Sequence, residues 1–365
     1  MAPDNRRILM KIAGIFLVAC LSFFVVFLSF LFGSIVDDKK GVRYTVTQGA
    51  SIKSVTDDLY ALDLIRHPFF FNVWIHLKRN QHELKSGDYL FPKGTTPFSL
   101  MNQITNGTGM FHYTFTIIAG WNFKHLREVL EREPDLKHTS ALMTDAAIMT
   151  YLGQSAMSPE GRFFPDTYFF SKGSSDLLIL KRAFQKMQNI FNTVWKNREP
   201  GLPYQTQNEA LTVASLIEKE TPLARERPII AGVIVNRLKK EMLLQIDPTV
   251  IYAAGARYNG TIYKKELLAD SPYNTYKRKG LPPTPIAIPG MESIQAALHP
   301  MHHDYYYFVA KNSALPAEGH QFSTTLLEHH IAVMNVITKS APWFNEDLIR
   351  SYFIKISGKD SVHEK

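Results

Sequence analysis

The feature that most constrains this chain is an uncharged apolar segment near its start, residues 12–36. A helix rises about 1.5 Å per residue, so this segment can cross a hydrocarbon core about 30 Å thick. Arg6, Arg7 and Lys11 precede it, and the positive-inside rule then keeps residues 1–11 in the cytoplasm. A cleaved signal peptide is the alternative, but its apolar core is only about 7–15 residues long and no Ala-x-Ala site follows. The sequence therefore predicts a single-pass anchor, with the rest of the chain on the far side.

The composition beyond this segment is that of a globular protein with a basic balance. At 365 residues and 45% hydrophobic content, the chain can form more than one domain with a proper core. A net charge of +8 favours an acidic partner, such as nucleic acid, anionic lipid or a carboxylate-bearing cell-wall polymer. No dinucleotide-binding, P-loop or zinc-finger motif supports nucleic acid, so we expect no nucleic-acid partner. The single cysteine, Cys20, excludes an intramolecular disulfide.

Short strands and helices alternate after the anchor. A strand is expected at residues 44–46, and Ser51 is a suitable N-cap for an amphipathic helix that ends at Leu62. The next expected elements are a helix at 68–78, a strand at 87–92 and a helix at 98–104. A larger region follows, with a strand at 112–118 and a long helix at 177–195. The sequence thus predicts an α+β fold with a small and a larger domain.

One helix of the larger domain carries two carboxylates among apolar residues. Thr206 and Glu209 have capping-box spacing, so this helix should begin after Thr206 and end before Pro222. At about 100° per residue, Glu218 and Glu220 fall on nearly opposite sides, and both sides are otherwise apolar. Burial raises the pKa of a carboxyl group, which allows it to act as a general acid near neutral pH. A buried ion pair also explains such a carboxylate, and the spacing does not say which Glu is the acid.

Loops rich in Tyr, Asn and carboxylates supply candidates for a substrate cleft. Aromatic rings pack on the apolar faces of sugars, and amide or carboxylate groups can bind sugar hydroxyls. The candidates are Glu160, Asp166, Gln245, Asp247, Tyr273, Asn274 and Tyr276. Each can also be an ordinary loop or capping residue, and Asp247 before Pro248 is typical of a helix start.

The histidines near the end of the chain do not form a recognised metal motif. His299, His302 and His303 lack the glutamate of a zinc-protease helix, and consecutive histidines often point apart. We therefore expect neither a metal ion nor another cofactor.

Several ordered motifs together resemble the endolytic murein transglycosylases, the YceG-like or MltG family. The motifs are Ser-Leu-Ile-Glu ending at Glu218, Leu-Gln-x-Asp ending at Asp247, and Ser-Pro-Tyr-Asn-Thr-Tyr ending at Tyr276. The resemblance covers residues 42–336. Three residues depart from the family pattern, in which Ser, Asn and Asn are expected: Ile246, Ile288 and His330. These departures put substrate contacts at Ile246 and Ile288 in doubt.

The resemblance implies a domain organisation and an acid. The implied parts are a LysM-like subdomain at 42–110, a transglycosylase catalytic domain at 111–345 and a C-terminal tail at 346–365. LysM modules bind amino-sugar glycans, so the first part is expected to grip the substrate; a purely structural spacer is the alternative. The family's catalytic acid matches Glu218, which leaves Glu220 to pair with Arg225 or Arg227.

The implied activity is that of a peptidoglycan lytic transglycosylase in the bacterial inner membrane, with its catalytic part in the periplasm. Glu218 would protonate the glycosidic oxygen between N-acetylmuramic acid and N-acetylglucosamine. It would then act as base while the muramyl 6-hydroxyl attacks C1 to give a 1,6-anhydro end. The family also implies work beside peptidoglycan synthases, where cleavage limits nascent strand length. Two alternatives stay open: a lysozyme-like hydrolase with Asp166, Asp247 or Glu160 as a second acid, and a non-catalytic glycan-binding scaffold.

Overall fold

The chain divides into two units in the computed structural model, which describes residues 3–47, 49–78, 84–312 and 315–340. Unit 1 comprises Met1–Thr114 and Phe169–Ser174, and unit 2 comprises Phe115–Tyr168 and Ser175–Lys365. The boundary runs through two short strands, β3 (Tyr113–Thr116) and β4 (Thr167–Phe170). It lies close to the predicted boundary at residues 110–111, whereas the return of Phe169–Ser174 to unit 1 is not evident from the sequence. The predicted tail, residues 346–365, lies outside the described residues.

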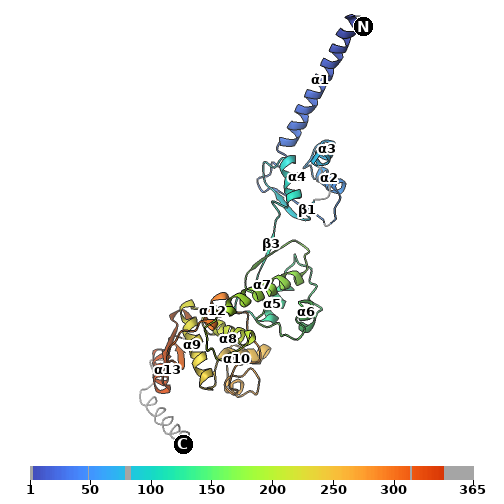
Figure 1. The fold of residues 1–365 in the computed structure, drawn as a ribbon. Helices are drawn as coiled ribbons and strands as arrows, with labels where there is room; N and C mark the ends of the chain where they lie inside the picture. The colour runs from blue at the N-terminus through green and yellow to red at the C-terminus, as the bar shows by residue number, and fades with distance from the viewer. Residues whose placement is uncertain (1–2, 48, 79–83, 313–314, 341–365) are drawn as a thin grey trace. The chain divides into compact units, whose positions relative to one another are not determined.

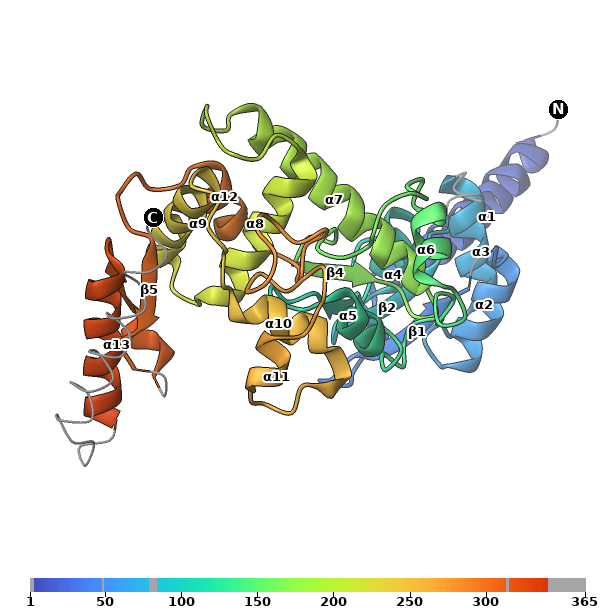
Figure 2. The same cartoon turned by 90° about the horizontal axis from the view of Figure 1, so that it is seen from below.

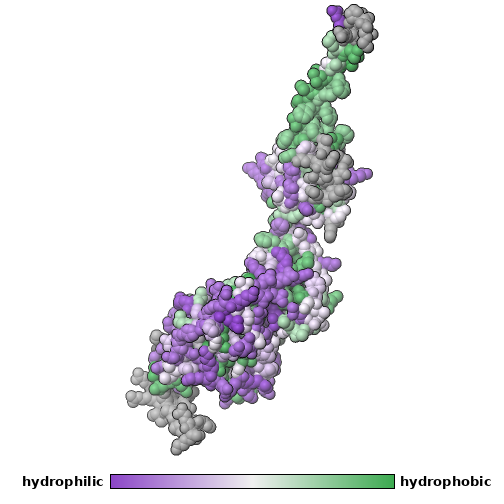
Figure 3. Space-filling model, in the orientation of Figure 1, coloured by the Kyte–Doolittle hydropathy of each residue, from purple (hydrophilic) through white to green (hydrophobic). Residues whose placement is uncertain are grey.

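The first helix of unit 1, α1 (Pro3–Phe32; Figure 1), exposes its apolar side chains (Figure 3). By length and composition, Arg7–Phe32 could cross a membrane. The helix ends at Phe32, whereas the sequence prediction extends the span to residue 36. Val36 is only 1% exposed because it packs in the core of unit 1. The prediction is therefore wrong at this end, where the last apolar residues belong to the folded unit.

A two-stranded antiparallel sheet with flanking helices forms the rest of unit 1. Its elements are β1 (Val42–Val46), α2 (Ile52–Ala61), α3 (Pro68–Lys78), β2 (Gly87–Phe91) and α4 (Pro97–Asn106). β1 pairs with β2 in a register that places Val42 opposite Phe91. Ser51 caps α2, since its side chain accepts a hydrogen bond from the Ser54 backbone N–H at 3.1 Å. The strands and helices predicted for this region are confirmed, with small shifts at their ends.

Unit 2 is mostly helical, with short strands near its C-terminal end. Its main helices are α5 (Phe123–Leu130), α6 (Asp145–Tyr151), α7 (Asp176–Lys196), α8 (Gln207–Glu220), α9 (Arg227–Lys239), α10 (Asp247–Ala254), α11 (Lys264–Leu267), α12 (Met291–Leu298) and α13 (Leu326–Ser340). The strands β5 (Tyr307–Ala310) and β6 (His320–Ser323) pair in antiparallel fashion. The predicted mixture of helix and strand is confirmed.

The central helix of unit 2 is α8, which packs against α9, α10 and α12 (Figure 2). Thr206 and Glu209 form the predicted capping box, with Glu209 N–H donating to Thr206 Oγ1 at 3.2 Å and Thr206 N–H donating to Glu209 Oε2 at 2.9 Å. Residues 210–217 are all buried. This burial fixes the end of the helix, and with it Glu218 and Glu220, close to the first residues of α9 and α10.

Candidate active site

Glu218, the predicted acid, lies in a hydrogen-bond network near the carboxyl end of α8. Its Oε2 atom accepts hydrogen bonds from the Gly290 backbone N–H at 2.9 Å and from Ser293 Oγ at 2.7 Å. Its Oε1 atom is 3.4 Å from Nη2 of Arg227, and its side chain is only 8% exposed. Arg227 also pairs with Glu292 at 2.5 Å. These contacts tie α8 to the first turns of α9 and α12 and engage both carboxylate oxygens of Glu218.

Glu220 occupies a different environment at the last position of α8. Its side chain is half-buried, and among the described residues no hydrogen bond to its carboxyl group is found. Burial raises the pKa of Glu220 to about 8, and the charge of Asp247 acts in the same direction while Arg237 opposes both. Such a group is mostly protonated at neutral pH and can donate its proton. The expected ion pair of Glu220 with Arg227 is wrong, because Arg227 pairs with Glu218.

Glu220 lines a cleft of about 540 Å³, the acid cleft. Three residues predicted from the sequence, Gln245, Asp247 and Tyr276, line the same cleft. The remaining walls come from α9, β5, β6 and α13 and include His320. The structure therefore brings the end of α8 together with the start of α10 and with the later loop that contains Tyr276.

Polar side chains within the acid cleft hold one another in place. The Tyr276 hydroxyl donates a hydrogen bond to Asp247, and burial together with Asp247 raises the pKa of Tyr276. Tyr276 thus keeps its proton and remains a donor. Arg237 Nη1 donates to Gln245 Oε1 at 3.2 Å and to the Leu244 carbonyl oxygen at 2.8 Å. Gln245 adopts a φ of 51°, an uncommon conformation that this arginine contact supports.

A buried carboxylate positions His320 at the acid cleft, a pair that the sequence prediction did not include among the site residues. Glu226 is 5% exposed, and its Oε2 atom lies 2.8 Å from His320 Nδ1. Its Oε1 atom accepts a hydrogen bond from the His320 backbone N–H at 2.7 Å, and Thr221 Oγ1 donates to Oε2 at 3.1 Å. Burial alone would raise the pKa of Glu226, but the hydrogen bonds from His320 outweigh it and hold the pKa below its ordinary value.

The residue before His320 shows how closely this pair is packed. Gly319 has a φ of 76°, and a Cβ atom at this position would lie 2.1 Å from Glu226 Oε1. Only glycine meets both requirements. The Gly319-His320 dipeptide is therefore the sequence signal from which the pair could have been found.

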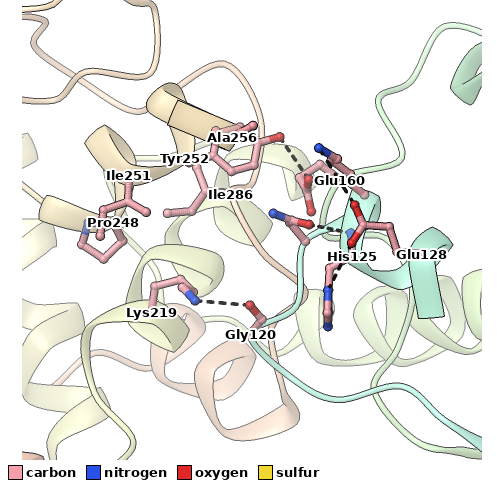
Figure 4. A pocket seen from close by; sticks show the side chains of 13 residues that line it. Gly120, His125, Glu128, Glu160, Lys219, Pro248, Ile251, Tyr252, Ala256 and Ile286 are labelled. Carbon is pink, nitrogen blue, oxygen red and sulfur yellow. Dashed lines mark hydrogen bonds and ion pairs between the residues drawn. The ribbon is translucent and has the colours of Figure 1, made fainter. Parts of the chain in front are cut away.

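A second cleft, of about 550 Å³, contains the predicted residue Glu160 (Figure 4). Glu160 is 5% exposed and accepts hydrogen bonds from the Tyr252 hydroxyl and the Phe123 backbone N–H, both at 3.0 Å. Burial raises the pKa of Glu160 to about 7, although these hydrogen bonds oppose the shift. Lys219 also lines the cleft, where its Nζ atom donates to the Gly120 carbonyl oxygen at 3.4 Å.

Consecutive residues of α8 and α10 line the two clefts. Lys219 and Pro248 line the second cleft, whereas Glu220 and Asp247 line the acid cleft. The clefts are thus neighbours on either side of the contact between α8 and α10. An extended polymer could contact both.

Three predicted residues, Asp166, Tyr273 and Asn274, line neither of these clefts. Asp166 pairs with Lys186, and the hydrogen bond between them holds the pKa of Asp166 below its ordinary value. Asn274 is 1% exposed, and its amide nitrogen donates to the Ala269 carbonyl oxygen at 2.8 Å. These three side chains therefore lie outside the two clefts described above, and Asn274 lines a third cleft of about 330 Å³ together with Arg257 and Asp270.

Comparisons with known proteins cover the part of the chain that contains both clefts. The sequence pattern of the YceG-like family matches residues 44–335. An endolytic murein transglycosylase of Bacillus subtilis is 33% identical over 312 residues, which cover 81% of this chain and 85% of that protein. The chain belongs to the YceG-like family.

Further relatives agree with this assignment. An endolytic murein transglycosylase of Streptococcus pneumoniae is 27% identical over 308 residues, which cover 75% of this chain and 55% of that protein. The crystal structure of a YceG-like protein from Listeria monocytogenes superposes with a TM-score of 0.51 at 28% identity, covering 80% of this chain and 99% of the Listeria chain. The predicted family and enzyme class, a lytic transglycosylase, are confirmed.

Two departures from the YceG-like pattern are explained by packing. Ile246 is 3% exposed and Ile288 is fully buried, and both lie in the apolar interior. Neither isoleucine lines the acid cleft or the second cleft, whereas His330, the third departure, lines the acid cleft. Across the described residues of this YceG-like protein, no group of three or more His, Cys, Asp or Glu could hold a metal ion.

Because the two glutamates have different surroundings, we expect their replacement by alanine to change the stability of the fold by different amounts. Glu218→Ala should lower the free energy of unfolding by about 3 kcal/mol, because it leaves Arg227 buried without its partner. Glu220→Ala, the matched control, removes a group without a hydrogen-bond partner and should change this free energy by less than about 1 kcal/mol. Urea unfolding of the detergent-solubilised protein, followed by tryptophan fluorescence, measures both. Equal losses in the two variants would contradict the structural role of Glu218.

Proposed function

We propose that this protein is a membrane-anchored endolytic transglycosylase of peptidoglycan strands, with Glu220 as its general acid. The observation that carries the proposal is the cleft that Glu220 lines together with Gln245, Asp247 and Tyr276, where burial raises the pKa of Glu220 to about 8. Glycosidic cleavage without a metal ion requires a carboxyl group that is protonated near neutral pH, because the leaving oxygen must receive a proton. The names of the Bacillus and Streptococcus relatives support murein as the substrate.

Glu218, the acid expected from the family motif, fits this role less well. Both of its oxygen atoms are engaged, by Arg227 on one side and by Gly290 and Ser293 on the other. A substrate oxygen could reach it only if this network opened. Both glutamates are partly buried, but Glu220 lines the acid cleft, so its proton can reach a bound glycan. We therefore propose Glu220 in place of Glu218.

In the proposed reaction, Glu220 donates its proton to the glycosidic oxygen as the bond from that oxygen to C1 of N-acetylmuramic acid breaks. The 6-hydroxyl of the same sugar then attacks C1, loses its proton to a base and closes a 1,6-anhydro ring. No water is consumed, so a second carboxyl group to activate water is not needed, unlike in most glycoside hydrolases. Gln245 and Tyr276 supply an amide and an aromatic ring for contacts with the sugars.

Asp247 supports a second candidate function, that of a lysozyme-like hydrolase. It lines the acid cleft and raises the pKa of Glu220 through its charge, so two carboxyl groups lie close together there. A second carboxylate could activate a water molecule. Against this, the Tyr276 hydroxyl already donates to Asp247. The chemical form of the new sugar ends distinguishes the two functions.

We propose the second cleft as an additional part of the glycan-binding surface. Ile251 and Ile286 give it apolar surface, and Glu160 gives it a carboxyl group held by Tyr252. The ammonium group of Lys219 could meet the lactyl or peptide carboxylates of peptidoglycan. This places Glu160 among the substrate-binding residues, as the sequence prediction expects, but away from the acid.

Unit 1 supports the anchoring part of the proposal. α1 is long and apolar enough to span the bacterial inner membrane, and the positive charges before it favour a cytoplasmic N-terminus and a periplasmic catalytic unit. The β1–β2 sheet with α2 and α3 is the candidate LysM-like part, which would grip glycan. A site tethered to the membrane suits cleavage of nascent strands beside peptidoglycan synthases, which would limit strand length.

Glu220→Gln should slow cleavage of purified uncrosslinked glycan strands by about 10²–10⁴-fold, because the general acid is lost. Glu218→Gln, measured in parallel, loses the ion pair with Arg227 but can keep the hydrogen bonds from Gly290 and Ser293, so it should lower the rate less than Glu220→Gln does. Mass spectrometry of the products from the full-length protein should show internal fragments with anhydro ends, one water lighter than hydrolysis products. Cleavage by the Glu220 variant together with loss of cleavage in the Glu218 variant would assign the acid to Glu218.

The pH dependence of the rate provides a separate check. A general acid must carry its proton, so kcat/KM should fall as pH rises through about 8, where Glu220 ionises. Asp247→Asn removes a negative charge that raises this pKa, so the same fall should occur at lower pH. Initial rates across the pH range for wild-type and Asp247→Asn protein measure the shift. A fall at the same pH in both would show that another group controls the rate.

A further inference from the structure

We propose that unit 1 inserts the first turn of α3 into the lipid bilayer beside α1. The proposal rests on membrane anchoring by α1. The Phe70 ring lies 5.6 Å from the ring of Phe23, 5.8 Å from that of Phe27 and 5.6 Å from that of Phe30. All three partners belong to α1, so the first turn of α3 packs along the apolar length of the anchor rather than at its end.

The positions of these partners set the depth of Phe70. Lys11 is the last charged residue before the apolar run. If the hydrocarbon core begins directly after it, a core about 30 Å thick covers about 20 residues and ends near residue 31. Phe23 then lies about 12 Å inside the far edge, and a span placed further along the helix moves it deeper. Phe70, in contact with Phe23, must share this apolar depth.

The first residues of α3, Pro68 and Phe69, suit a lipid environment. Phe69 is 67% exposed, which would leave a large apolar ring in water if the turn lay outside the bilayer. α3 begins with Pro68, which has no N–H group to leave unpaired in lipid. The Trp74 ring lies 5.4 Å from that of Phe98, which lies 5.3 Å from that of Phe32 in α1, and tryptophan is enriched at membrane interfaces.

Spin labels on the full-length protein in phospholipid vesicles test this contact. In a Cys20→Ser background, a nitroxide on Phe69→Cys should be more accessible to oxygen than to a water-soluble nickel chelate. Labels on Leu17→Cys in α1 and on Thr45→Cys in β1 serve as lipid and water references. A lipid signal at Leu17 with a water signal at Phe69 would overturn the proposal and leave the anchor intact. Water signals at both positions would reject the anchor itself.

Discussion

The ion pair between Glu218 and Arg227 fixes the carboxyl end of α8, and the geometry of the acid cleft depends on it. The two side chains are 8% and 12% exposed, so removing one would leave the other charge uncompensated in the interior. Donors from the first turn of α12 complete the network around Glu218. With the end of the helix held in this way, Glu220 lies at the cleft, where burial and Asp247 raise its pKa. Two carboxyl groups on one helix thus acquire different roles from their surroundings.

Local rules predict much of this fold from the sequence. The capping box of Thr206 and Glu209 and the N-cap at Ser51 involve residues three positions apart, and the structure contains each of them. Apolar periodicity likewise locates the helices of unit 1. It cannot distinguish lipid from protein as the apolar environment, which is why the sequence predicts Val36 in the membrane span although this residue packs inside unit 1.

The identity of the acid could not be predicted in the same way. Both glutamates lie on apolar sides of α8, so a helical wheel treats them alike. The two glutamates differ in their tertiary surroundings: Arg227 pairs with Glu218, whereas the charge of Asp247 acts on Glu220. The Glu226–His320 pair joins residues 94 positions apart and has no local signature beyond the glycine before the histidine. Pairings of this kind follow from the packing of whole elements.

The two neighbouring clefts suit a polymer better than a small molecule. The acid cleft supplies the reacting group, and the second cleft, on the other side of the α8–α10 contact, offers apolar surface with a buried carboxyl group. Binding energy from sugars in the second cleft could position the bond in the first. An enzyme that cuts strands internally needs contacts on both sides of the scissile bond, and this arrangement provides room for them.

Infrared difference spectroscopy of the wild-type protein against Glu220→Gln tests most directly whether Glu220 is protonated at neutral pH. We expect a carbonyl band of a protonated carboxyl group that is present near neutral pH, absent in the variant and lost as pH rises through about 8. Glu218→Gln should leave this band in place. A band that disappears near the ordinary glutamate pKa of about 4.3 would show that Glu220 is ionised under working conditions and cannot be the acid.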